Sequence, residues 1–248
     1  MPFLAKIQDK VLSLKSYQMN PGSCKALGEA FGLYDGVLEK LYFESTGTND
    51  EMFALILQGL LDQQCFKSIT YKRNQLGLKS LDLIVKMIKR PMPQNLDQLK
   101  IVNCRLNPKA IQTFLPQIHD SNLRKLSLVK TGINSTMLVY ILQLLSKSRS
   151  LIELDISWNN LLPWDLKKLF EVLSTNRQLQ HLNISWNNMQ EMDKQNLTEL
   201  NKKAEVKNSL RDEIWVLKVK IEHLKQIQAE RDDVDTDGEE VAAEMSAT

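Results

Sequence analysis

The chain has 248 residues, of which 43% are hydrophobic and 25% are charged, a composition typical of one or two globular domains. Its formal net charge of +2 divides into −6 for residues 231–248, which hold seven acids and one arginine, and +8 for the rest. The basic residues of the body are not clustered with stacking aromatic residues, so a nucleic-acid partner is not favoured.

The cysteines and the apolar segments limit the compartment. Cys24, Cys65 and Cys104 form neither a metal-ligand pair nor a redox motif, so we expect free thiols, a reducing compartment and no cofactor. No apolar run is long enough for a signal peptide or a membrane span. The sequence therefore predicts a cytoplasmic protein without a membrane anchor.

A leucine-rich pattern begins again every 27 to 30 residues along most of the chain. Its good copies begin at Leu38, Phe66, Leu96, Leu123, Leu151 and Leu179, and a weaker copy begins at Asp9. The fourth and sixth positions of each copy are apolar, which is the alternation of a short strand. These pairs are Leu12 and Leu14, Leu41 and Phe43, Ile69 and Tyr71, Leu99 and Ile101, Leu126 and Leu128, Leu154 and Ile156, and Leu182 and Ile184. Self-similarity at this period is typical of a stacked architecture, here of about seven units.

Each copy continues with a polar position and then a helical stripe. The ninth residues are mostly small and able to hydrogen-bond to backbone groups left unpaired where the chain leaves the strand. They are Tyr17, Thr46, Asn74, Cys104, Thr131, Asn159 and Asn187. Further on, apolar residues spaced by three, one and three positions, as from Phe53 to Leu60, predict the buried face of a helix. Three of these helices have start signals at Asn107, at Asn134 or Ser135, and at Pro163 with Asp165.

The helical stripe fails in the last copy. Its positions there are Lys194, Leu197, Thr198 and Asn201. A polar outer face is typical of a terminal cap, because no further repeat covers it. We therefore place the repeat domain at residues 1–190.

These features resemble the ribonuclease-inhibitor-like class of leucine-rich repeat proteins. The resemblance rests on six copies in register of a unit with a strand, an Asn, Cys or Thr turn position and a full helix, over about residues 9–190. It implies an α/β solenoid shaped like a horseshoe, with a parallel sheet on the concave face and helices on the convex face. It says little about function, because this fold hosts many activities.

Two further segments follow the repeats. Residues 191–230 are expected to form a helical cap or a short coiled coil, and residues 231–248 a disordered acidic tail that is either a solvated end or a binding element. If the chain from Ser209 is helical, the heptad positions of a parallel dimer are Leu210, Ile214, Leu217, Ile221 and Leu224. Self-association through 210–228 is one expectation. The alternatives are a helix that packs on its own solenoid and a degenerate eighth strand.

Residues beside the strand leucines are expected to line the concave face, which is basic in the first five units and acidic and aromatic in the last two. The candidate partner-binding residues are Lys72, Lys100, Lys125, Glu153, Asp155, Trp158, His181 and Trp186. Trp158 and Trp186 occupy equivalent positions on strands about 4.8 Å apart, so they should stand side by side as a binding hot spot. The alternatives are that the lysines are merely solvated and that the indoles cover the turn asparagines.

The function expected from these features is binding. Neither a nucleophile nor a glycine-rich loop accompanies Glu153 and Asp155, and the histidines lack ligand spacing, so an enzyme is not expected. We expect a scaffold that binds a protein partner through its concave face. The resemblance alone suggests a cytoskeletal or ciliary assembly. The alternative is a regulator of another enzyme, because repeats with an acidic tail look like activators of the small GTPase Ran.

Overall fold

The computed structural model describes residues 4–187 except 62, 64–65 and 92–94. Its elements are η1 (Leu4–Lys6), β1 (Ile7–Gln8), β2 (Val11–Lys15), α1 (Pro21–Gly32), β3 (Lys40–Glu44), α2 (Asp50–Leu60), β4 (Ser68–Lys72), α3 (Leu78–Ile88), β5 (Gln98–Val102), α4 (Pro108–Gln117), β6 (Lys125–Val129), α5 (Ser135–Lys147), β7 (Glu153–Asp155), α6 (Pro163–Leu173) and β8 (His181–Asn183). The predicted cap stripe of the last repeat, the dimer residues from Leu210 to Leu224 and the acidic tail lie outside the described residues.

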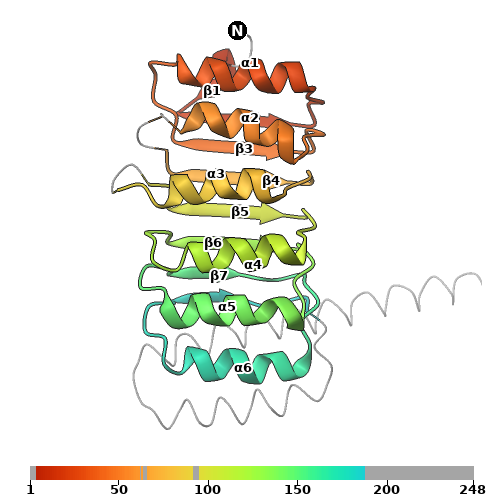
Figure 1. The fold of residues 1–248 in the computed structure, drawn as a ribbon, viewed down its shortest axis with the longest axis vertical. Helices are drawn as coiled ribbons and strands as arrows, with labels where there is room; N and C mark the ends of the chain where they lie inside the picture. Colours follow the sequence, from red (N-terminus) through yellow and green to blue (C-terminus); the bar gives the residue numbers. More distant parts are fainter. Residues whose placement is uncertain (1–3, 62, 64–65, 92–94, 188–248) are drawn as a thin grey trace, which may run out of the picture.

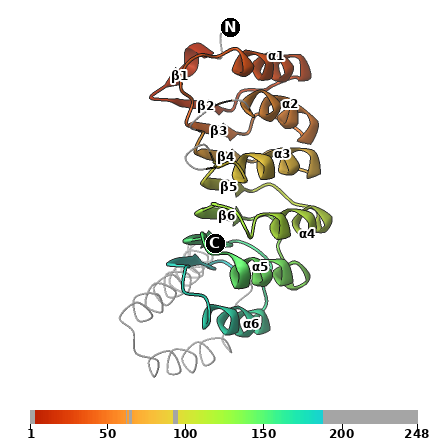
Figure 2. The ribbon, with the colours of Figure 1, turned by 60° about the vertical axis from the view of Figure 1, so that its left-hand side comes forward.

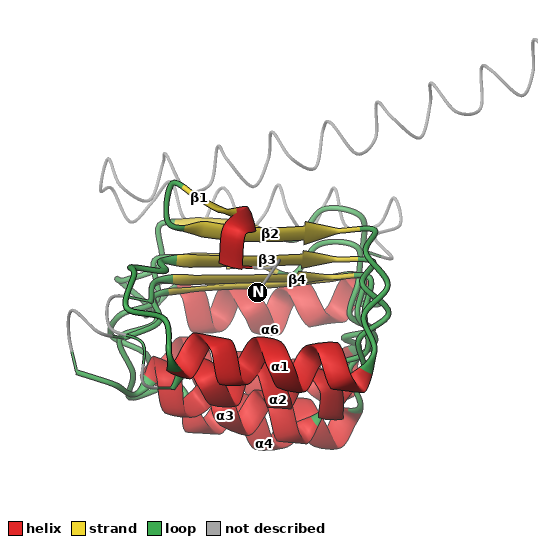
Figure 3. Cartoon of the chain, turned by 90° about the horizontal axis from the view of Figure 1, so that it is seen from above, coloured by secondary structure: helices red, strands yellow, loops and turns green. Residues whose placement is uncertain are grey.

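The described strands form one open sheet in chain order. Strands β2 to β8 pair in parallel, and β1 pairs antiparallel with β2. One α-helix follows each strand from β2 to β7, and α1 to α6 are stacked in the same order along the sheet (Figure 1). All six helices cover the same side of the sheet, as the turned views show (Figures 2 and 3). The predicted α/β class and the alternation of strand and helix are therefore confirmed.

The repeat positions explain the core. Strand pairing puts equivalent positions opposite one another, as in Leu41 with Ile69 and Ile69 with Leu99. The fourth and sixth residues of every unit are buried, and so is most of the helical stripe that packs on them. Because successive side chains of a strand point to opposite sides, the residues between them lie on the side turned away from α1–α6. We call that side the outward face.

Asparagines begin four of the helices. The side chains of Asn20, Asn49, Asn107 and Asn134 accept hydrogen bonds from backbone N–H groups of the first turn. This satisfies donors that have no partner within a helix. The predicted cap at Asn107 is confirmed, and of the two candidates for the next helix Asn134 is the cap. Pro163 begins α6 as predicted, and Asp165 accepts the Leu162 N–H at 2.9 Å.

The ninth residues fill the interior beside the strand ends. Six of the seven are buried, and Tyr17 is the exception with 41% of its surface exposed. Asn159 shows what the position does. Its Oδ1 accepts the N–H groups of Thr131, Gly132 and Ile133, and its Nδ2 donates to three carbonyl groups. One side chain therefore satisfies a whole turn of the preceding unit, as the sequence predicts for these positions.

Candidate functional site

The outward face carries rows of equivalent residues, one from each strand. The third-position row runs Val11, Lys40, Ser68, Gln98, Lys125, Glu153 and His181. The fifth-position row runs Ser13, Tyr42, Thr70, Lys100, Ser127, Asp155 and Asn183. All eight candidate residues lie in these rows or at the strand ends beside them. They fall into two groups, because Lys72 and Lys100 lie on β4 and β5, whereas the other six lie from β6 onward.

A left-handed turn follows every strand from β2 onward, directly after β2 to β6 and three residues after the ends of β7 and β8. The residues that form it have φ between +50° and +56°, and they are Ser16, Ser45, Arg73, Asn103, Lys130, Trp158 and Trp186. Such a conformation is strained for any residue other than glycine. In compensation, the first six donate their backbone N–H to a carbonyl of the next unit at 2.8 to 3.1 Å. The turn therefore links the repeats and sets the direction of the side chain that it carries.

In the last two described units this turn carries tryptophan. The rings of Trp158 and Trp186 are stacked, with centroids 4.5 Å apart and planes at 14°. The Lys130 ammonium lies 5.8 Å from the Trp158 ring centroid. Trp158 remains 48% exposed although the asparagine beside it is buried, so its indole is stacked at the surface and available to a partner. Trp186 is half-buried.

Two polar turns hold the tryptophans in place. Asp155 Oδ1 accepts the N–H and the hydroxyl of Ser157 at 3.0 and 2.6 Å. Asn183 Oδ1 makes the same pair of contacts with Ser185 at 3.1 and 2.7 Å. Such turns are a common use of Asp and Asn, because their short side chains mimic a backbone acceptor. Asp155 therefore has a structural role in the turn before Trp158, and its role toward a partner stays a prediction.

The other charged candidates of this group lie on the third-position row. Lys125 Nζ lies 2.7 Å from Glu153 Oε2, so these two predicted binding residues pair with each other across β6 and β7. His181 is exposed and lies opposite Glu153 in register. A partially exposed ion pair contributes little to stability. The ion pair of Lys125 with Glu153 leaves the surface beside the aromatic stack with little net charge.

A second group of charged residues surrounds Tyr42. The sequence did not predict Tyr42 as a site residue. The ammonium groups of Lys15 and Lys72 lie 4.9 and 5.2 Å from its ring centroid, one from each flanking strand. The Tyr42 hydroxyl donates to Glu44 at 2.5 Å, and Arg73 lies 3.7 Å from the same carboxylate. The hydroxyl, followed by the nearby cations, lowers the pKa of Glu44.

The structure also adds two valines to the aromatic corner. Val102 and Val129 are half-buried at the ends of β5 and β6, opposite each other in register. Val102 directly precedes the left-handed turn residue Asn103, and Val129 directly precedes Lys130. The turn of the following unit carries Trp158. We name Val102, Val129, Trp158 and Trp186 the apolar edge. The valines stand at the seventh position of their copies, where the residue type varies from unit to unit, so the sequence pattern does not predict them.

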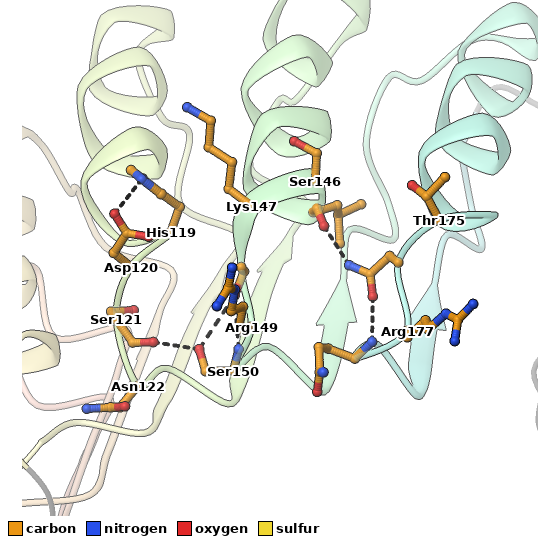
Figure 4. A pocket seen from close by; sticks show the side chains of 14 residues that line it. His119, Asp120, Ser121, Asn122, Ser146, Lys147, Arg149, Ser150, Thr175 and Arg177 are labelled. Carbon is orange, nitrogen blue, oxygen red and sulfur yellow. Dashed lines mark hydrogen bonds and ion pairs between the residues drawn. The ribbon is translucent and has the colours of Figure 1, made fainter.

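A polar pocket of about 800 Å³ lies at the other end of the strands, between the loops that follow α4, α5 and α6 (Figure 4). Its side chains satisfy the loops themselves. The Ser150 hydroxyl donates to the Ser121 and Leu123 carbonyls, and Asn176 Nδ2 donates to the Leu145 carbonyl. Three exposed cations, Lys147, Arg149 and Arg177, line its rim. We assign the inner polar groups to the packing of the repeats.

The described residues form neither a metal cluster nor a membrane-spanning helix. Among residues 4–187, apart from the gaps noted above, no three His, Cys, Asp or Glu side chains are grouped as metal ligands. Every helix in the described part of the chain is too short or too polar to cross a bilayer.

Together these features describe a one-sided repeat protein that presents an aromatic surface at the ends of its last described strands. No family model and no curated protein matches the chain. Among solved structures it is similar to one described as "Leiomodin-1 Actin-Binding Site 2 (ABS2)", with 14% identity and a TM-score of 0.38. That match covers 83% of this chain and 96% of the other. A likeness of this size carries no inference about activity.

Proposed function

We propose that the chain is a non-enzymatic interaction module that binds a protein partner on the outward face, with the apolar edge as its anchor. The observation that carries the proposal is the stack of Trp158 on Trp186 with almost half of the Trp158 surface still exposed. Exposed aromatic rings held rigid by their surroundings are typical hot spots of protein interfaces. We also propose that the repeats form a leucine-rich repeat solenoid of the horseshoe type, with the outward face on its concave side.

The residues around the stack support this role. Lys130 lies beside one ring and the ion pair of Lys125 with Glu153 lies on the same sheet, so charge surrounds an apolar centre. A rim of this kind excludes water and selects the partner, whereas the buried centre supplies most of the affinity. The turn hydrogen bonds of Asp155 and Asn183 fix the backbone before each tryptophan. The anchor is therefore ordered before binding, which lowers the entropy lost on association.

The test is affinity purification from cells with the full chain, followed by mass spectrometry. Trp158→Ala combined with Trp186→Ala is expected to abolish recovery of a partner that the natural chain retains, while the circular dichroism spectrum stays unchanged. Trp164→Ala is the matched control. Trp164 is 58% exposed on α6, so this substitution removes an indole that lies outside the apolar edge. Equal recovery by the double variant and the control would contradict the proposal.

Regulation of another enzyme remains the second expectation from the sequence. Its test is the turnover of purified small GTPases with and without the chain. If the chain changes the turnover of none of the GTPases in a panel, the regulator hypothesis is wrong.

A further inference from the structure

The strongest charged surface outside the apolar edge lies at the other end of the outward face. Strands β2 to β5, with the residue after each, carry the cations Lys15, Lys40, Lys72, Arg73 and Lys100. Their single acid is Glu44, so the excess is four positive charges. We name these five cations the basic half. Like charges this close repel one another, which makes the surface a site for an anionic group.

Glu44 is the only acid on the described strands β2 to β5, and it neutralises the basic half only in part. Glu44 already accepts the Tyr42 hydroxyl and lies beside Arg73. Lys15 and Lys72 are held over the Tyr42 ring, a contact that orients an ammonium group but does not cancel its charge. Lys40 and Lys100 form no ion pair with any described residue. Two oriented ammonium groups on one aromatic platform, with further lysines on the neighbouring strands, fit a flexible chain of carboxylates.

The sequence supplies such a chain. Residues 231–248 hold seven acids and one arginine, with no aromatic residue. The 43 residues between Asn187 and Arg231 can reach up to about 140 Å when fully extended. The four strand spacings from β8 to β4 amount to only about 19 Å. The connecting length therefore suffices. Tethering also makes this contact intramolecular, which favours it over binding of a free peptide.

We propose that residues 231–248 bind in cis to the basic half of the outward face, with the Lys15, Tyr42 and Lys72 cluster at the centre of the contact. The tail and an acidic partner segment would then compete for this half of the face. This inference goes beyond the proposed function and does not depend on it, because the contact forms within one chain. The Trp158 and Trp186 substitutions leave it intact.

The experiment uses full-length chains and a fluorescein-labelled peptide of residues 231–248, followed by fluorescence anisotropy at low salt. The chain is compared with a full-length variant whose seven acids from Asp232 to Glu244 are replaced by their amides. The amide variant is expected to bind the peptide at least tenfold more tightly, because its own tail no longer occupies the site. In 500 mM NaCl this binding is expected to be lost, because exposed charges are screened within about 4 to 5 Å.

Matched substitutions locate the site in the amide variant. Lys15→Gln with Lys72→Gln is expected to weaken peptide binding at least fivefold. Lys86→Gln with Lys109→Gln, which removes two exposed lysines from α3 and α4, is expected to leave it unchanged. Equal affinity of the natural chain and the amide variant would overturn the proposal, and so would equal loss from both lysine pairs. Sedimentation tests whether the tail contact forms within one chain. If the natural chain self-associates through its tail as the protein concentration rises, the tail binds a second copy and binding in cis is overturned.

Discussion

Trp158 stacks on Trp186 although both residues have φ of +56°, a conformation that bulky residues seldom adopt. The strain is repeated in every described unit at the same position, and it accompanies a hydrogen bond to the next unit in six of them. The turn is thus a property of the repeat, and tryptophan occupies it in the last two described units, where the outward face is aromatic and acidic. An indole placed there stands at the end of the sheet and contacts its equivalent in the next unit.

This relationship predicts opposite effects of glycine at two positions. Trp158→Gly and Trp158→Ala both lose the stack, but glycine adopts a positive φ freely, so the glycine variant should be more stable by about 1 kcal/mol. At Ser13, an exposed strand residue of β2, Ser13→Gly should instead be less stable than Ser13→Ala by roughly 0.5 to 1 kcal/mol. Urea unfolding measures both differences. The same order of stability at the two positions would refute a left-handed turn at Trp158.

The interior asparagines predict a large loss of stability at one residue and a small one at its neighbour. Asn159→Ala leaves the three N–H groups bound by its Oδ1 and the carbonyls bound by its Nδ2 without partners, so unfolding free energy should fall by about 3 kcal/mol or more. Asn160 is exposed, and Asn160→Ala should cost less than about 1 kcal/mol. Chemical denaturation compares the two. Similar losses would show that the Asn159 network is not a source of stability.

Two glycines allow close approach of α1 and α2. A Cβ at Gly59 would lie 1.8 Å from the Gly28 carbonyl oxygen, and a Cβ at Gly28 would lie 2.2 Å from the Leu55 carbonyl oxygen. Because these neighbours are backbone atoms, Gly59→Ala must move the helices apart and should destabilise the protein by about 2 kcal/mol or more. Gly32, at the end of α1, has open space around it, so Gly32→Ala should be neutral or slightly stabilising. Thermal unfolding of the two variants tests the contact, and a harmless Gly59→Ala would contradict it.

The buried thiol of Cys24 predicts a pH dependence. Burial raises the pKa of Cys24 from 9.0 to about 11, so between these values the unfolded chain loses its proton while the folded chain keeps it. Stability from this group is complete below about pH 8.5 and falls as pH rises toward 11, by roughly 2 to 3 kcal/mol. Cys24→Ala should flatten this part of the curve, although buried Cys104, whose pKa is also raised, still contributes. The measurement is urea unfolding from pH 8 to pH 11, and parallel curves for the two proteins would contradict the assignment.

The sequence by itself determined the repeat and its buried side. The leucine period predicted which residues point to the helices, and Leu41, Ile69 and Leu99 lie where it places them, because burial of an apolar pattern is a local requirement. The ninth-position residues followed from the same period, except at Tyr17, which is too large for the interior and lies at the surface.

Only the tertiary structure decided which side chains on the outward face meet. The sequence placed Lys125 and Glu153 on one face, but their ion pair depends on the register of β6 with β7. The cluster of Tyr42 with Lys15 and Lys72 joins residues from three units, and the valines of the apolar edge had no pattern of their own. Solvent-facing positions carry no burial requirement, so the repeat period does not determine which residue type occupies them. Their neighbours are fixed only when the strands pair and the left-handed turns aim the side chains along the sheet.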